Sequence, residues 1–131
     1  MVVRIAEAID AEAIAKVQVE SWRAAYRELM PDELLAGLDT SKRAAVWRQV
    51  CGGAGWATLV VEDRDAVVGF CHVCPARDAD LDSRATAELT AIYVDPIAWG
   101  RGCGRLLCAR AVAEARQRGA TSMALEAGLS C

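Results

Sequence analysis

A loop with three alternating glycines is the feature that most constrains this chain. It lies between a strand-like run, Thr86 to Val94, and a run with helical periodicity, Cys103 to Arg118. Gly100, Gly102 and Gly104 permit backbone conformations and close approaches that a Cβ would prevent. The helix that follows directs unpaired N–H groups and the positive end of its dipole at the loop. The sequence therefore predicts a cradle for a phosphate or pyrophosphate.

The spacing of this loop does not match two common phosphate-binding motifs. A Walker-type loop requires Gly-Lys followed by Ser or Thr, and the chain contains no Gly-Lys pair. A dinucleotide fingerprint requires a third glycine where Arg105 stands, and its loop normally follows the first strand rather than a late one. A glycine-rich turn without a ligand is the simplest alternative, but an ordinary strand-to-helix connection rarely needs three alternating glycines.

The segment Trp99-Gly-Arg-Gly-Cys-Gly104 resembles the Gln/Arg-x-x-Gly-x-Gly/Ala signature of the GNAT superfamily of acyl-CoA-dependent N-acyltransferases. Trp99 departs from it, because the family most often has Gln or Arg there. The resemblance extends to Glu88 to Pro96, which looks like the family's fourth strand and exit turn. It also includes Ser21 to Tyr26 and Leu29 to Pro31, which are similar to the first-helix region of one bacterial branch.

This resemblance implies that acetyl-CoA is the cosubstrate and that backbone amides of the loop hold its pyrophosphate. It also implies an exposed backbone N–H near the end of the preceding strand, where negative charge develops on the thioester oxygen. The residues expected to bind the cofactor are Ile92, Tyr93, Val94, Trp99, Gly100, Arg101, Gly102, Cys103, Gly104 and Arg105.

Glu88 is the expected catalytic base, acting directly or through a water. A lysine-type amine has a pKa of about 10.4, so removing its proton near pH 7 costs roughly 4 to 5 kcal/mol. Simple alternation along the strand places Glu88 on one face with Thr90, Ile92 and Val94. A solvated carboxylate at the end of a strand is the alternative interpretation.

The general acid for the departing thiolate is not assigned, because the chain has only two tyrosines. Simple alternation puts Tyr93 on the strand face opposite Glu88. Trp22 and Tyr26, on the first predicted helix, are expected to line the acceptor pocket or to belong to the core.

The order of the predicted elements indicates an α/β fold in one domain, residues 1–131. The resemblance implies a GNAT-like mixed, mostly antiparallel sheet flanked by helices. The expected strands are Val2 to Ile5, Trp56 to Glu62, Ala66 to Val73, Thr86 to Val94 and Ser122 to Ala127. The expected helices are one that Asp10 caps and that runs to about Arg27, one after Pro31, a turn or two from Thr40 or Ser41, and one from Cys103 to Arg118.

Against the family pattern, the domain is C-terminally short and lacks the usual last helix and hairpin. A strand that ends the chain would leave an unpaired edge, which a second copy could cover. We therefore expect a two-fold homodimer whose interface includes Thr121 to Cys131. A shortened gene product or an engineered fragment would account for the same feature.

Charge and hydropathy exclude several classes of partner. The net charge of -3 gives no electrostatic basis for binding nucleic acid. No apolar run approaches the roughly 20 residues of a membrane span, and the N-terminus lacks the pattern of a signal peptide. The expected location is the cytoplasm.

The cysteines present a choice between a metal site and a buried strand. Cys71-His-Val-Cys74 has the spacing of a metal knuckle, but a structural zinc site needs four ligands and the chain has one histidine. Alternation along Val67 to Cys74 favours a strand in which cysteine acts as a small apolar residue. No metal is expected.

The resemblance, together with these residues, implies an enzyme that transfers acetyl from acetyl-CoA to a primary amine of a small molecule or peptide. The acceptor itself cannot be read from the sequence. A catalytically silent acyl-CoA-binding or regulatory module is the alternative, and a remnant that binds no CoA is a weaker one.

Overall fold

The computed structural model describes residues 1–25, 39–52, 57–75 and 86–125. Its strands are β1 (Val2–Ile5), β2 (Ala57–Asp63), β3 (Ala66–Pro75), β4 (Thr86–Val94) and β5 (Ser122–Leu125). Its helices are α1 (Ala11–Ala25), α3 (Thr40–Gly52) and α4 (Cys103–Gln117), with short 3-10 turns η1 (Ala8–Asp10) and η2 (Pro96–Ala98).

The strands form one five-stranded sheet in the order β1-β2-β3-β4-β5. All neighbours are antiparallel except β4 and β5, which pair in parallel. Arg64 and Asp65 join β2 to β3 in a two-residue turn with φ angles of 54° and 66°, the left-handed conformation that suits a tight hairpin. The expected α/β fold with a mostly antiparallel sheet is confirmed.

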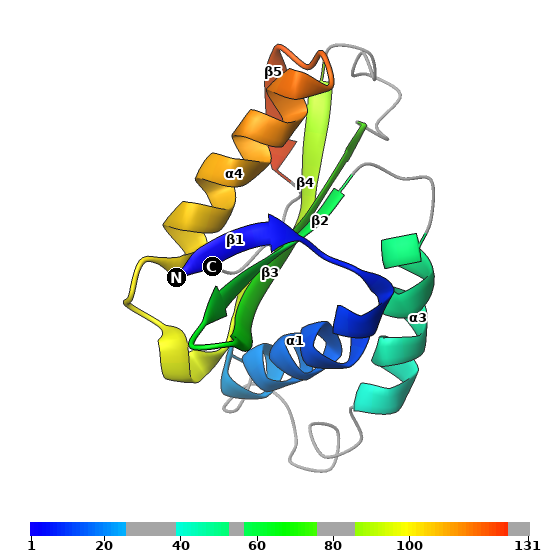
Figure 1. Ribbon diagram of the computed structural model, residues 1–131, viewed down its shortest axis with the longest axis vertical. Helices are drawn as coiled ribbons and strands as arrows, with labels where there is room; N and C mark the ends of the chain where they lie inside the picture. The colour runs from blue at the N-terminus through cyan, green and yellow to red at the C-terminus, as the bar shows by residue number, and fades with distance from the viewer. Residues whose placement is uncertain (26–38, 53–56, 76–85, 126–131) are drawn as a thin grey trace.

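Helices cover both faces of the sheet (Figure 1). On one face, α4 buries Cys103, Leu107 and Ala111, which recur every fourth residue and form one apolar stripe. On the other face, α1 and α3 bury a second cluster that includes Ile14 and Trp47. The sheet is therefore the middle layer of three, and its central strands are buried on both sides.

A β-bulge interrupts β4 near its middle. His72 pairs with Ala91 while Val73 pairs with Leu89, so Thr90 is an extra residue on β4. Beyond the bulge, each side chain of β4 faces the layer opposite to the one that strict alternation from the start of the strand would give. Leu89 and Ile92, three residues apart, both pack against α4.

Gly69 lies where three elements meet with no room for a side chain. A Cβ there would be 2.9 Å from Val61 Cγ1, 3.2 Å from the Tyr93 carbonyl oxygen and 3.3 Å from Leu107 Cδ1. Because these neighbours are buried and packed, we expect Gly69→Ala to lower the free energy of unfolding by about 1 to 3 kcal/mol. Urea denaturation followed by circular dichroism measures the change.

Gly104→Ala is the matched control for this substitution. A Cβ at Gly104 meets no atom within 4 Å, and the residue lies in the first turn of α4. Alanine favours helix over glycine, so this variant should be at least as stable as the parent. Equal unfolding midpoints for the parent and Gly69→Ala would show that the atoms around Gly69 can move aside without loss of stability.

The predicted elements agree with the structure with two local corrections. The helix expected to run for a turn or two from Thr40 or Ser41 is α3, which extends over 13 residues. Asp10 was expected to cap the first helix, but its carboxylate accepts hydrogen bonds from the Glu7 backbone N–H and the Arg4 guanidinium, each at 2.8 Å. The hydrogen bonds from Arg4 lower the pKa of Asp10 below its usual value. The region after Pro31 lies outside the described residues, as does most of the expected dimer interface, so the homodimer stays a prediction.

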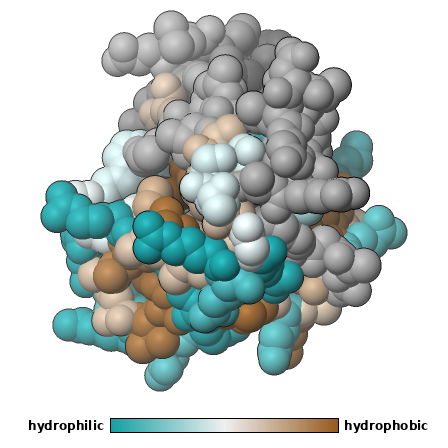
Figure 2. All heavy atoms as spheres, turned by 90° about the horizontal axis from the view of Figure 1, so that it is seen from above, coloured by the Kyte–Doolittle hydropathy of each residue, from teal (hydrophilic) through white to brown (hydrophobic). Residues whose placement is uncertain are grey.

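Hydrophilic side chains project from much of the described surface in Figure 2, with smaller hydrophobic areas between them. Within the described ranges, no helix is both long and apolar enough to cross a membrane.

Candidate functional site

The glycine loop leads directly into α4 and leaves the start of that helix open. Gly100 and Gly102 have φ angles of 78° and 86°, which glycine adopts without strain. Gly102 is the N-cap residue, and no side chain caps the helix N-terminus. Backbone N–H groups of the first turn are therefore available to an anion, with the helix dipole in their favour.

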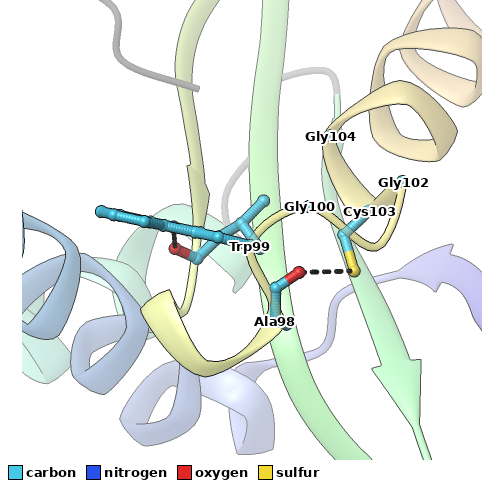
Figure 3. A pocket seen from close by; sticks show the side chains of 7 residues that line it. Ala98, Trp99, Gly100, Gly102, Cys103 and Gly104 are labelled. Carbon is cyan, nitrogen blue, oxygen red and sulfur yellow. Dashed lines mark hydrogen bonds between the residues drawn. The ribbon is translucent and has the colours of Figure 1, made fainter.

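A pocket of about 300 Å³ opens at this helix start (Figure 3). Six of the ten residues predicted to bind the cofactor line it, and Ala98 is a lining residue that sequence reasoning missed. Ala98 is the last residue of η2, the turn that begins at Pro96, and it belongs to no recognisable motif. The lining residues are Val94, Ala98, Trp99, Gly100, Gly102, Cys103 and Gly104.

Gly104 is a glycine whose presence the fold does not explain. Its φ is not positive, and a Cβ there would meet no atom within 4 Å. Glycine in a helix is less stable than alanine by about 1 kcal/mol. The open space beside Gly104 therefore fits a group from outside the chain, and the uncapped N–H groups next to it suit a phosphate.

The two arginines of the loop have different surroundings. Arg101 forms an ion pair with Asp63 at 2.6 Å, which ties the loop to the β2–β3 hairpin. Arg105 is exposed on the first turn of α4. Neither lines the pocket, so a contact between these side chains and the cofactor stays a prediction.

Trp99 and Ser21 both donate hydrogen bonds to the carbonyl oxygen of Val94, the last residue of β4. The Trp99 indole Nε1 lies 2.7 Å from this oxygen (Figure 3), and the Ser21 Oγ lies 2.9 Å from it. Ser21 is buried on α1, 73 residues away in sequence. One carbonyl thus joins α1, β4 and the glycine loop, and the sequence analysis did not predict this contact of Ser21.

The pairing of β4 with β5 covers only part of β4. Ladder pairs run from Thr86 with Ser122 to Leu89 with Leu125. Beyond Leu89, the described residues include no β5 partner for β4. Ile92, Tyr93 and Val94 lie on this stretch, so its backbone can present hydrogen-bonding groups to a ligand.

The structure corrects the predicted strand faces of two candidate residues. Simple alternation put Glu88 with Ile92 and Val94 and put Tyr93 opposite. The bulge changes this arrangement, because Ile92 and Val94 pack against α4 while Tyr93 packs with the α1 and α3 cluster. Glu88 alternates with Leu89, which also packs against α4, so Glu88 shares its face with Tyr93.

Trp22 and Tyr93 are in direct contact on that face. The Trp22 indole donates a hydrogen bond to the Tyr93 hydroxyl at 3.1 Å, and the rings meet edge to face with centroids 6.1 Å apart. The Arg43 guanidinium lies over the Trp22 ring, 4.6 Å from its centroid. Both aromatic residues are half-buried, and Tyr26 lies outside the described residues.

The cysteine-rich segment forms β3, as alternation predicted. Cys71 is buried against α4, and burial raises the pKa of its thiol to about 12. His72 Nδ1 lies 2.8 Å from Thr58 Oγ1. In the ranges that the structure describes, no group of three or more histidine, cysteine, aspartate or glutamate side chains is placed to hold a metal ion.

Comparison with known proteins identifies relatives across nearly the whole chain. Residues 12–130 match the model of the Acetyltransferase (GNAT) family. YuaI, an uncharacterized N-acetyltransferase of Bacillus subtilis (strain 168), is 31% identical over 121 residues, which span 92% of this chain and 68% of YuaI.

Solved structures share the fold. The structure of yncA from Salmonella typhimurium with acetyl-CoA is 30% identical, with a TM-score of 0.70, and the match covers 95% of this chain and 68% of that one. The aminoglycoside N-acetyltransferase AAC(6')-Iy in complex with CoA has a TM-score of 0.73 at 16% identity, covering 97% of this chain and 76% of that one. At that identity the likeness concerns the fold alone.

Proposed function

The chain belongs to the acetyltransferase (GNAT) family, and we propose that it transfers the acetyl group of acetyl-CoA to a primary amine of a small molecule or peptide. The family match and the named N-acetyltransferase relative support an acetyltransferase. Acetyl-CoA is present in the related yncA structure, which supports the choice of cosubstrate.

The observation that carries this proposal is the uncapped start of α4 beside the open pocket. Gly102 caps the helix with backbone alone, and Gly104 leaves space where a side chain would stand. A pyrophosphate placed there would accept hydrogen bonds from the first-turn N–H groups and would benefit from the helix dipole.

The proposed reaction is direct attack of the amine on the thioester. The amine nitrogen bonds to the carbonyl carbon and the carbon–sulfur bond breaks. The nitrogen loses a second proton as the amide forms, and the departing thiolate takes up a proton and leaves as free CoA. A backbone N–H in the stretch Ile92 to Val94 would stabilise the developing oxyanion. Glu88 would take the proton that the ammonium loses, directly or through a water.

The acceptor would approach from the α1 and α3 side of the sheet. Glu88 and Tyr93 face that side, and Trp22 contacts Tyr93 there. We infer that Trp22 and Tyr93 line the acceptor pocket, and Tyr26, which follows α1 in sequence, stays a candidate for the same role.

Release of free thiol tests this function directly. Wild-type protein is mixed with acetyl-CoA and a panel of amines that includes amino acids, polyamines, aminoglycosides and lysine peptides, and thiol is measured with a chromogenic disulfide. We expect amine-dependent thiol release with at least one class. CoA binding by calorimetry without release for any amine would instead support a silent acyl-CoA-binding module, and no CoA binding would contradict both.

A further inference from the structure

We propose that the Trp99 ring is an apolar wall along which the pantetheine arm of acetyl-CoA passes, and that Ser21 positions this wall through the Val94 carbonyl. The inference rests on the proposed function, because it takes acetyl-CoA as the ligand of the pocket. It assigns to Trp99 a contact through an aromatic ring, which the Gln or Arg of the family signature does not have.

The route of the arm follows from where the two ends of the ligand must lie. The pyrophosphate belongs at the start of α4, and the thioester must reach the stretch of β4 beyond Leu89, for which the described residues include no β5 partner. Trp99 and Val94 both line the pocket between these points. The pantetheine arm, which starts with an apolar gem-dimethyl group, therefore has to pass them.

The indole of Trp99 can offer only its ring to the ligand. Its single donor, Nε1, is already bonded to the Val94 oxygen at 2.7 Å. The residue is nevertheless 46% exposed and forms part of the pocket wall. An exposed aromatic surface whose polar atom is satisfied favours contact with methyl and methylene groups over contact with phosphate.

Ser21, on α1, donates a hydrogen bond to the same Val94 carbonyl. Its hydroxyl is buried on α1 and donates to the Val94 oxygen at 2.9 Å. A carbonyl oxygen has two lone pairs, so two donors satisfy it fully. Ser21 thereby holds in place the oxygen that accepts the hydrogen bond of the Trp99 indole. It affects the ligand through Trp99 and does not contact the ligand itself.

Calorimetry with two ligands tests the wall. CoA and 3′-phospho-ADP share the nucleotide and pyrophosphate, but only CoA carries the pantetheine arm. We expect Trp99→Ala to weaken CoA binding about 10-fold and to leave 3′-phospho-ADP binding within about 2-fold. Trp99→Phe keeps a ring and should lose less CoA affinity than Trp99→Ala.

The possible outcomes separate this inference from the function on which it rests. If Trp99→Ala weakened the binding of CoA and of 3′-phospho-ADP equally, the ring would contact the nucleotide, and the proposed contact with the pantetheine arm would be wrong. Unchanged CoA affinity in that variant would overturn it as well. Failure of the wild-type protein to bind either ligand would contradict the proposed function itself.

A double-mutant cycle tests the positioning role of Ser21. We expect Ser21→Ala to weaken CoA binding about 3-fold in the parent and not at all in the Trp99→Ala background, because the wall it positions is then gone. Ser21→Thr keeps the hydroxyl and should restore most of the affinity. Equal effects of Ser21→Ala in both backgrounds would show that Ser21 only packs α1 and would overturn its assigned role.

Discussion

Glu88→Gln is expected to lower kcat by about 10²-fold while the affinity for CoA stays within about 2-fold. The substitution keeps the size and polarity of the side chain and removes its capacity to accept a proton. Loss of a general base affects the transition state and not the binding of the cosubstrate. Steady-state kinetics with the best amine of the panel, combined with calorimetry for CoA, measures both quantities.

The control and the pH profile sharpen this prediction. Glu12→Gln changes a carboxylate whose side chain is 82% exposed on α1, and it should leave kcat unchanged. If Glu88 is the base, its variant should also lose the acidic limb of the profile of kcat against pH. A parallel fall in CoA affinity and kcat would make Glu88 a structural residue, and full activity would make it a solvated carboxylate.

The elements that the sequence predicted well are those with a strong local signal. β4 spans Thr86–Val94, as predicted from its alternating pattern, and α4 starts at Cys103, as predicted, directly after Gly102. Gly119 follows α4 with a φ of 95°, as a helix stop requires. Such features depend on residues close together in the chain.

The bulge in β4 could not be predicted, because it is defined by the pairing of β4 with another strand. Thr90 is extra only relative to β3, and no glycine marks the position. A shift of one residue exchanges the two faces of a strand. The prediction for Tyr93 was therefore wrong about its face even though the limits of the strand were correct.

The hydrogen bond of Ser21 could not be predicted for a related reason. A serine on an apolar helix face gives no indication of its partner, and its acceptor is a backbone carbonyl 73 residues away. Arg43 lies over Trp22 from a helix separated from α1 by residues outside the described ranges. Sequence patterns predicted the glycine loop and the start of α4, which form one contiguous segment, but not the contacts between segments that position this loop.

Gly104→Asp is expected to weaken CoA binding by about 10²-fold and at the same time to leave the fold intact. A Cβ at Gly104 would meet no atom within 4 Å, so we expect the new side chain to be accommodated without displacing the protein. A carboxylate in the first turn of a helix interacts favourably with the dipole, so unfolding should need as much urea as in the parent, or more. The same carboxylate would occupy the phosphate position and repel the ligand, and about 10²-fold corresponds to about 2.7 kcal/mol.

Two further variants at Gly104 divide this effect into its parts. Gly104→Asn has nearly the size of aspartate without its charge, so the difference between the two measures the repulsion, which should shrink as salt is added. Gly104→Val tests steric exclusion alone and should also weaken CoA binding. Unchanged CoA affinity in a folded Gly104→Val protein would show that the ligand does not approach this glycine, and the cradle would then lie elsewhere. If Gly104→Asp keeps or raises the stability of the fold while it lowers the affinity for CoA, the ligand binds at the start of α4. Damage to the fold would instead lower both quantities.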